Sequence, residues 1–189
     1  MKNYRYTLGK EKVLGLSQDF FVYYSMYVNR DHEWLTTQVV CKLLEAYETS
    51  PVNTCVAIVS PDYSSSIGMH VAHHLSKGGE MMDILFIDVH YPDESPNSYR
   101  EKFMDPNNPA GIVSFYKYDK VILVEAGIIT GGNYTFLKKV FNLHNIEPIT
   151  VAQYENVHSV FQSDVVGAYY DSKVAELEFY WERYNKHWD

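Results

Sequence analysis

Short apolar runs recur along the chain, and their length suits strands better than helices. They occupy residues 54–59, 83–89, 120–124, 147–152 and 165–169. Segments whose apolar residues repeat at helical spacing stand between several of these runs. Strands that alternate with helices favour a parallel sheet with helices on its faces. Since the length of 189 residues is typical of one domain, the sequence predicts a single α/β domain with a mostly parallel central sheet flanked by helices.

Helices are also predicted at both ends of this arrangement. Asp31 is a suitable N-cap for a first helix, whose apolar face comprises Leu35, Val39, Leu43 and Tyr47, with Val40 and Leu44 alongside. A closing helix over residues 172–189 has one apolar side, formed by Leu177, Trp181, Tyr184 and Trp188. That side either covers the core or contacts a second subunit, and the pattern leaves both interpretations open.

Two stretches lack a regular pattern. Residues 1–30 are aromatic and irregular, with β-prone pieces. Residues 91–119 are long, polar and rich in Pro and Asn. An irregular segment of that length in a compact domain usually carries function or is mobile. We therefore expect a flexible loop over 91–119.

Composition excludes several classes of function. The formal net charge is -8 and no cluster of Lys and Arg is present, so nucleic acid is not an expected partner. The two cysteines form neither a disulfide framework nor a metal motif, which is typical of a reducing compartment. No segment resembles a signal peptide or a membrane span. We expect a soluble, cytoplasmic protein that has no membrane partner.

The segment Val121–Asn133 carries the clearest chemical signal. An apolar strand leads into Glu125, then into a turn that contains Thr130-Gly131-Gly132, and then into a helix. Glycines let backbone N–H groups approach a phosphate closely, and a helix N-terminus adds unpaired donors and a partial positive charge. In open α/β sheets, ligands bind at the carboxyl ends of the strands. This segment therefore predicts a phosphate-binding turn.

The same segment resembles the signature of the type I phosphoribosyltransferases, most closely that of orotate phosphoribosyltransferase. The resemblance implies a phosphoribosyltransferase-like fold and a loop that holds the ribose 5-phosphate part of phosphoribosyl pyrophosphate (PRPP). The implied phosphate- and ribose-binding residues are Glu125, Ala126, Gly127, Ile128, Ile129, Thr130, Gly131, Gly132 and Asn133. Glu125 is also an implied catalytic residue, which would accept hydrogen bonds from the hydroxyls of the sugar.

Further segments extend the resemblance over roughly residues 12–170. Residues 1–30 take the place of a small hood over the base, with Phe20, Phe21, Tyr23 and Tyr24 as its candidate contacts. The implied pyrophosphate loop comprises Pro61, Asp62, Tyr63, Ser64 and Ser65. The resemblance further implies a homodimer and a nucleotide or phosphoribosyl ligand. It implies Mg²⁺ held through the ligand's phosphates, with no metal site in the protein itself.

This sequence departs from the family pattern where positive charge and a second acid are usual. Ala126 stands at the position of the second acid, and Val89-His90 replaces an Arg-Lys pair. Arg100 and Lys102 are the nearest candidates for cationic catalytic groups. Asp62 in the implied pyrophosphate loop would repel a polyanion. Two hypotheses follow: a divergent transferase acting on a base such as orotate, or a non-catalytic nucleotide-binding, regulatory or structural homodimer.

A histidine cluster offers a competing site. His70, His73 and His74 fall on one predicted helix at spacings that place them near one face. Such histidines bind metals when further ligands complete the set. No cysteine or suitably spaced carboxylate on that helix does so, and we expect ordinary packed or solvated histidines.

Overall fold

The computed structural model describes residues 33–47, 49, 52–76, 79–89 and 98–171. Five strands form one sheet in the order β2-β1-β3-β4-β5, and every neighbouring pair is parallel. The strands are β1 (Thr54–Val59), β2 (Asp83–Ile87), β3 (Lys120–Ile128), β4 (Glu147–Asn156) and β5 (Val165–Tyr170). The helices are α3 (Pro61–Leu75), α4 (Ser98–Met104), the 3-10 helix η1 (Ile112–Phe115) and α5 (Gly132–Leu143), and residues 33–44 are also helical. The predicted α/β domain with a parallel sheet is confirmed.

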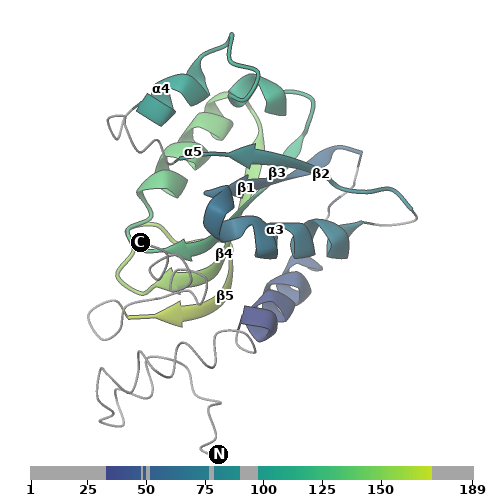
Figure 1. Ribbon diagram of the computed structural model, residues 1–189, viewed down its shortest axis with the longest axis vertical. Helices are drawn as coiled ribbons and strands as arrows, with labels where there is room; N and C mark the ends of the chain where they lie inside the picture. The colour runs from purple at the N-terminus through teal and green to yellow at the C-terminus, as the bar shows by residue number, and fades with distance from the viewer. Residues whose placement is uncertain (1–32, 48, 50–51, 77–78, 90–97, 172–189) are drawn as a thin grey trace, which may run out of the picture.

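Each face of the sheet has its own apolar core. One core joins the sheet to α4, η1 and α5, and the other joins it to α3 and the helix at 33–44. Figure 1 shows these helices on opposite sides of the sheet. Because both faces are covered, β1 is buried along its whole length. The carboxyl ends of β1, β3 and β4 therefore meet at one edge of the sheet.

Residues 98–118 correct the prediction of a loop over 91–119. They fold into α4 and η1, although Pro106 and Pro109 interrupt the segment. The apolar side chains of this segment enter the core beside α5, namely those of Tyr99, Phe103, Ile112, Phe115 and Tyr118. Their aromatic and aliphatic surface drives the packing, a signal that the surrounding polar residues mask in the sequence.

The helix at 33–44 buries a different face from the predicted one. Leu35, Val39 and Leu43 are exposed, whereas Val40 and Leu44 are fully buried. Polar groups share the buried face: the side-chain amide of Gln153 on β4 donates to the carbonyl of Glu33 and to the hydroxyl oxygens of Thr36 and Thr37. The buried face therefore combines apolar packing of Val40 and Leu44 with hydrogen bonds to β4.

Some predictions lie outside the described residues. They concern the hood at 1–30, with Phe20, Phe21, Tyr23 and Tyr24, and the closing helix at 172–189. Within the described part of the chain, no helix has both the length and the apolar character that a membrane crossing requires.

Candidate functional site

Glu125 occupies the carboxyl end of the sheet, as the sequence predicts. It lies on β3 opposite Ala152 of β4, and the hydroxyl of Ser60, directly after β1, donates to its Oε1 at 3.4 Å. Glu125 is partly buried. Burial raises the pKa of Glu125 to about 7, and hydrogen bonds from Ser60 and Asn133 act in the opposite direction. The site therefore contains an acid that changes charge near neutral pH.

A hydrogen-bonded chain connects Glu125 with α4. The Tyr99 hydroxyl donates to Oδ1 of Asn133 at 2.8 Å, and Nε of Arg100 donates to the Tyr99 hydroxyl oxygen at 3.2 Å. Since Oδ1 of Asn133 accepts from Tyr99, its NH₂ group is the donor to Glu125. The chain thus joins Arg100, Asn133 and Glu125, which were selected from the sequence.

The candidate cations of α4 occupy different environments. The guanidinium carbon of Arg100 lies 5.1 Å from the ring centre of Phe136, which together with Tyr99 fixes its position. Lys102 is exposed on the same helix. Arg100 is therefore the cation that the structure connects to the acid.

The turn that the sequence predicts to bind phosphate is shorter than expected. β3 continues through Glu125 and Gly127 to Ile128, where it still pairs with Glu155 of β4. The turn proper is 129–131, and α5 begins at Gly132. Pairing with β4 extends the strand through Gly127 to Ile128. The sequence did not predict this extension, because glycine is unusual in strands.

The backbone of this turn has unpaired donors on one side. The carbonyl of Ile129 accepts from the side-chain amide of Asn156 at 2.9 Å, and the carbonyl of Thr130 accepts from the N–H of Val160 at 3.2 Å. The C=O and N–H groups of one planar trans peptide point in opposite directions. The N–H groups of Thr130 and Gly131 therefore point away from the segment at 156–160, and neither has a hydrogen-bond partner among the described residues. The first N–H groups of α5 continue this row of donors.

Gly131 is required in this turn for two reasons. Its φ of 80° lies in the left-handed region. A Cβ atom added here would also stand 2.4 Å from Cβ of Phe161 and 2.6 Å from Oγ of Ser159. Only glycine lets the segment at 156–161 pack against the turn.

Ala126 has a structural role in place of a second acid. The residue is fully buried in the core that contains α3. Its N–H donates to Oγ of Ser64 at 2.9 Å, which ties β3 to α3. A carboxylate at this position would enter an apolar core.

The residues of the predicted pyrophosphate loop, 61–65, are helical rather than irregular. They form the first turn of α3, with Pro61 at its start, Asp62 exposed and Ser64 fully buried. Ser60, with φ of 51°, makes the sharp turn out of β1, and its carbonyl accepts from the N–H groups of Tyr63 and Ser64. Proline at the first helical position was a usable signal for this boundary.

Sequence reasoning missed two polar side chains of the site. Ser60 and Tyr99 both enter the hydrogen-bonded chain at Glu125. Ser60 precedes a proline at a strand end, which is a recognisable turn position. Tyr99 carries no such signal, since it is one of 17 tyrosines. No group of three potential metal-ligating side chains is found among the described residues.

Several solved structures share this fold. The hypoxanthine phosphoribosyltransferase of Staphylococcus aureus matches with a TM-score of 0.50 and 14% identity, over 76% of this chain and 75% of that chain. The hypoxanthine phosphoribosyltransferase of Trypanosoma cruzi matches at 0.51 and 15%, over 78% and 79%. The HGPRT-ase of Leishmania tarentolae, solved in complex with GMP, matches at 0.50 and 12%, over 80% and 87%. No protein-family model and no curated protein sequence matches. The chain has the fold of the phosphoribosyltransferases.

Proposed function

We propose that this protein is a divergent phosphoribosyltransferase-like protein that binds a phosphorylated ribose at the carboxyl end of β3. One observation carries the proposal: the N–H groups of Thr130 and Gly131 are unpaired and point away from the packed segment, at the N-terminus of α5. Oriented backbone donors at a helix start form a site for a phosphate.

The neighbouring groups divide the ligand between them. The phosphate accepts from the backbone N–H groups of residues 130–133 and from the exposed hydroxyl of Thr130. The carboxyl of Glu125, on β3 just before the turn, accepts from the ribose hydroxyls. A carboxylate accepts more strongly than a neutral acid, so ribose binding strengthens as the pH rises through the pKa of about 7.

Transfer chemistry makes demands that the described residues meet poorly. Release of diphosphate from PRPP requires positive charge at the leaving group. The first turn of α3, where the leaving group would lie, contains the negatively charged Asp62. Arg100 already donates to the Tyr99 hydroxyl and packs on the ring of Phe136. Mg²⁺ carried by the diphosphate would supply charge without a protein site. We therefore propose that ligand binding persists while turnover with PRPP and orotate is absent or very weak. The alternative of a non-catalytic nucleotide-binding protein rests on the same residues.

Calorimetry and thermal shift with the full chain test the proposal. Ribose 5-phosphate, PRPP with Mg²⁺ and nucleoside monophosphates should each raise the melting temperature by mass action, whereas ribose should not. A pyrophosphate-release assay with PRPP and each common base tests turnover. If ribose 5-phosphate gives neither heat nor a shift, the proposal fails. Robust pyrophosphate release would show that Arg100, Lys102 or a partner subunit supplies the missing charge.

A homodimer is part of this proposal. The helix at 33–44 leaves four large apolar side chains at least 44% exposed, namely Trp34, Leu35, Val39 and Leu43. Such a stripe is typical of an interaction surface. Light scattering should give twice the chain mass of 22.0 kDa, and a mass equal to that of one chain would contradict the dimer.

A further inference from the structure

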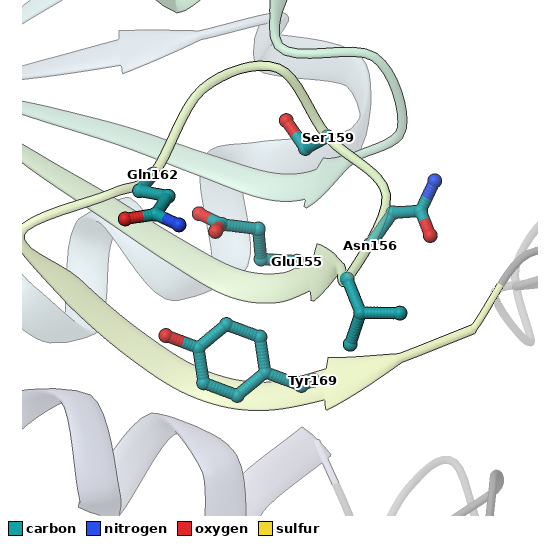
Figure 2. A pocket seen from close by; sticks show the side chains of 6 residues that line it. Glu155, Asn156, Ser159, Gln162 and Tyr169 are labelled. Carbon is teal, nitrogen blue, oxygen red and sulfur yellow. The ribbon is translucent and has the colours of Figure 1, made fainter.

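Two glutamates near the carboxyl edge of the sheet receive their hydrogen bonds in different ways. Glu155 of β4 lies in a pocket under the connection between β4 and β5, and its Oε2 accepts from the backbone N–H of Ser163 at 2.9 Å. Figure 2 shows this carboxylate in the pocket, with the ring of Tyr169 alongside on β5. Glu125 of β3 instead accepts from side chains, one of which is the amide of Asn133. A backbone N–H has a fixed direction, whereas a side chain must be oriented by a further contact.

The side chain of Asn133 has two ends of opposite character. Its NH₂ group donates hydrogen bonds and its Oδ1 accepts them. If Oδ1 faced Glu125, the amide would repel the carboxylate instead of stabilising it. The contact at the far end of the amide therefore decides whether Glu125 receives a donor.

Arg100 gives this hydrogen-bonded chain its direction, because a guanidinium has donors and no acceptor. Its Nε donates to the Tyr99 hydroxyl oxygen at 3.2 Å, and the hydroxyl in turn donates to Oδ1 of Asn133 at 2.8 Å. Since Oδ1 is occupied in this way, the NH₂ group is the end that faces Glu125. Each link thus fixes the orientation of the next.

The Tyr99 hydroxyl is held in place by the packing of its ring. Tyr99 is only 5% exposed, and its ring meets that of Phe136 edge to face with the centroids 5.8 Å apart. Phe103, one turn further along α4, packs against Phe136 and Phe141 of α5. Because these contacts involve the rings, Tyr99→Phe removes the hydroxyl and keeps the packing of α4 on α5.

We infer that Tyr99 is a positioning residue for Glu125, which acts by holding the Asn133 amide in the orientation that donates to the carboxyl. The inference rests on the proposed function, in which that carboxyl accepts from the ribose hydroxyls. A donor to the carboxylate favours the charged form, so Tyr99 extends ribose binding to lower pH. Tyr134 of α5 also lies near Glu125, but burial raises its pKa well above the usual range, so it stays neutral.

The affinity for ribose 5-phosphate, measured by calorimetry on the full chain between about pH 5 and pH 9, tests the inference. In Tyr99→Phe the midpoint of the pH dependence should rise by about 0.5–1 pH unit, because the charge-assisted hydrogen bond from Asn133 is weakened. Well above both midpoints the two proteins should bind equally, since the carboxyl is then charged in each. A merely structural defect would lower the affinity at every pH.

Asn133→Ala shows whether Tyr99 acts through Asn133. This variant removes the donor itself, so the midpoint should rise by about 1–2 pH units. The double variant should show no further rise, because the two residues act in series. The matched control is Tyr118→Phe, which removes another buried hydroxyl, one that donates to Asp83 at the start of β2. It should leave the midpoint unchanged.

NMR of the Glu125 carboxyl carbon in the ligand-free protein separates this inference from the proposed function. The resonance is assigned by its absence in Glu125→Gln, and its pKa should rise in Tyr99→Phe and Asn133→Ala as the midpoints do. An unchanged pKa in either variant, additive shifts in the double variant or an equal shift in Tyr118→Phe would overturn the inference. If the pKa shifts appear but ribose 5-phosphate does not bind, the positioning role stands and the proposed function is wrong.

Discussion

Two strand-to-helix turns lie side by side at the carboxyl edge of the sheet, and their backbones follow a similar course. β1 enters α3 through Ser60 and β3 enters α5 through Gly131, both with positive φ (51° and 80°). The α3 turn has Pro61 at its start, which lacks an N–H, and Asp62 beside it. The α5 turn has no acidic residue in its first turn and retains unpaired donors. Similar geometry therefore leaves unpaired donors for an anion at only one of the turns.

The difference bears on reaction as well as binding. A transferase must hold the phosphate of the sugar and also the departing diphosphate. The α5 turn has donors for the former. In the α3 turn, the carbonyl of Ser60 already accepts two N–H groups and Ser65 donates its hydroxyl to the carbonyl of Pro61. We therefore expect a ligand that is held only at the α5 turn to bind without reacting.

The largest expected effect comes from restoring an acid next to Glu125. Ala126→Asp would place a carboxylate in an apolar core and strain the Ala126–Ser64 hydrogen bond that joins β3 to α3. We expect a loss of about 3–5 kcal/mol in the free energy of unfolding, typical of an unpaired buried charge. Urea unfolding measures it. Ala126→Gly should cost much less, and a stable Ala126→Asp protein would show that this position faces solvent.

Gly131→Ala tests the close approach between the α5 turn and the segment at 156–161. The substitution combines a positive φ with a collision against Phe161, so we expect a loss of about 2–4 kcal/mol and of ribose 5-phosphate binding. Gly79→Ala is the matched control, because Gly79 has φ of 86° and no described atom within 4 Å of an added Cβ. It should cost only about 1 kcal/mol. Equal losses of stability in the two variants would mean that the segment at 156–161 moves to accommodate the added methyl group.

Glu125→Gln tests the buried acid by its pH dependence. The folded protein raises the pKa of Glu125 from 4.5 to about 7, so it binds a proton more tightly than the unfolded chain does. This contribution to stability is present below pH 4.5 and is lost as the pH rises to about 7. Above that window Glu125→Gln should be more stable than the wild type by up to about 3 kcal/mol. Urea unfolding at about pH 5 and pH 8 measures the difference. A gain that is the same at both pH values would contradict the raised pKa.

The smallest expected effect belongs to Asp62→Asn at the α3 turn. A carboxylate in the first turn of a helix stabilises it by about 0.3–1 kcal/mol, so a loss of that size is expected. The affinity for PRPP should rise about two- to fivefold, since an exposed repulsion disappears, while the affinity for ribose 5-phosphate stays constant. Calorimetry with both ligands provides the comparison. An equal change for both would place Asp62 near the sugar phosphate instead.

The positions of the strands follow from the sequence, but the ends of the elements at the site do not. Apolar runs located all five strands because strands buried on both faces have continuous apolar sequences. Glu125 and the glycines after it were found because a strand that ends in an acid and a glycine turn is a local pattern. Gly127 was read as part of that turn, because pairing with Tyr154 depends on a strand further along the chain. Glu155 and Tyr169 become neighbours only when β4 and β5 pair, so no local pattern marks the pocket.

The two cores also provide a chemical means of watching each face of the sheet separately. Cys41 belongs to the core on the α3 face and Cys55 to the core on the α5 face, and the chain has no other cysteine. Burial raises the pKa of both thiols, to about 12 for Cys55. Since the thiolate is the reactive form, an alkylating reagent modifies either cysteine mainly when its core opens. Peptide mapping of the labelled protein then gives an opening rate for each face. When a ligand binds at the carboxyl edge of the sheet, the cysteine whose labelling slows identifies the face that the ligand stabilises.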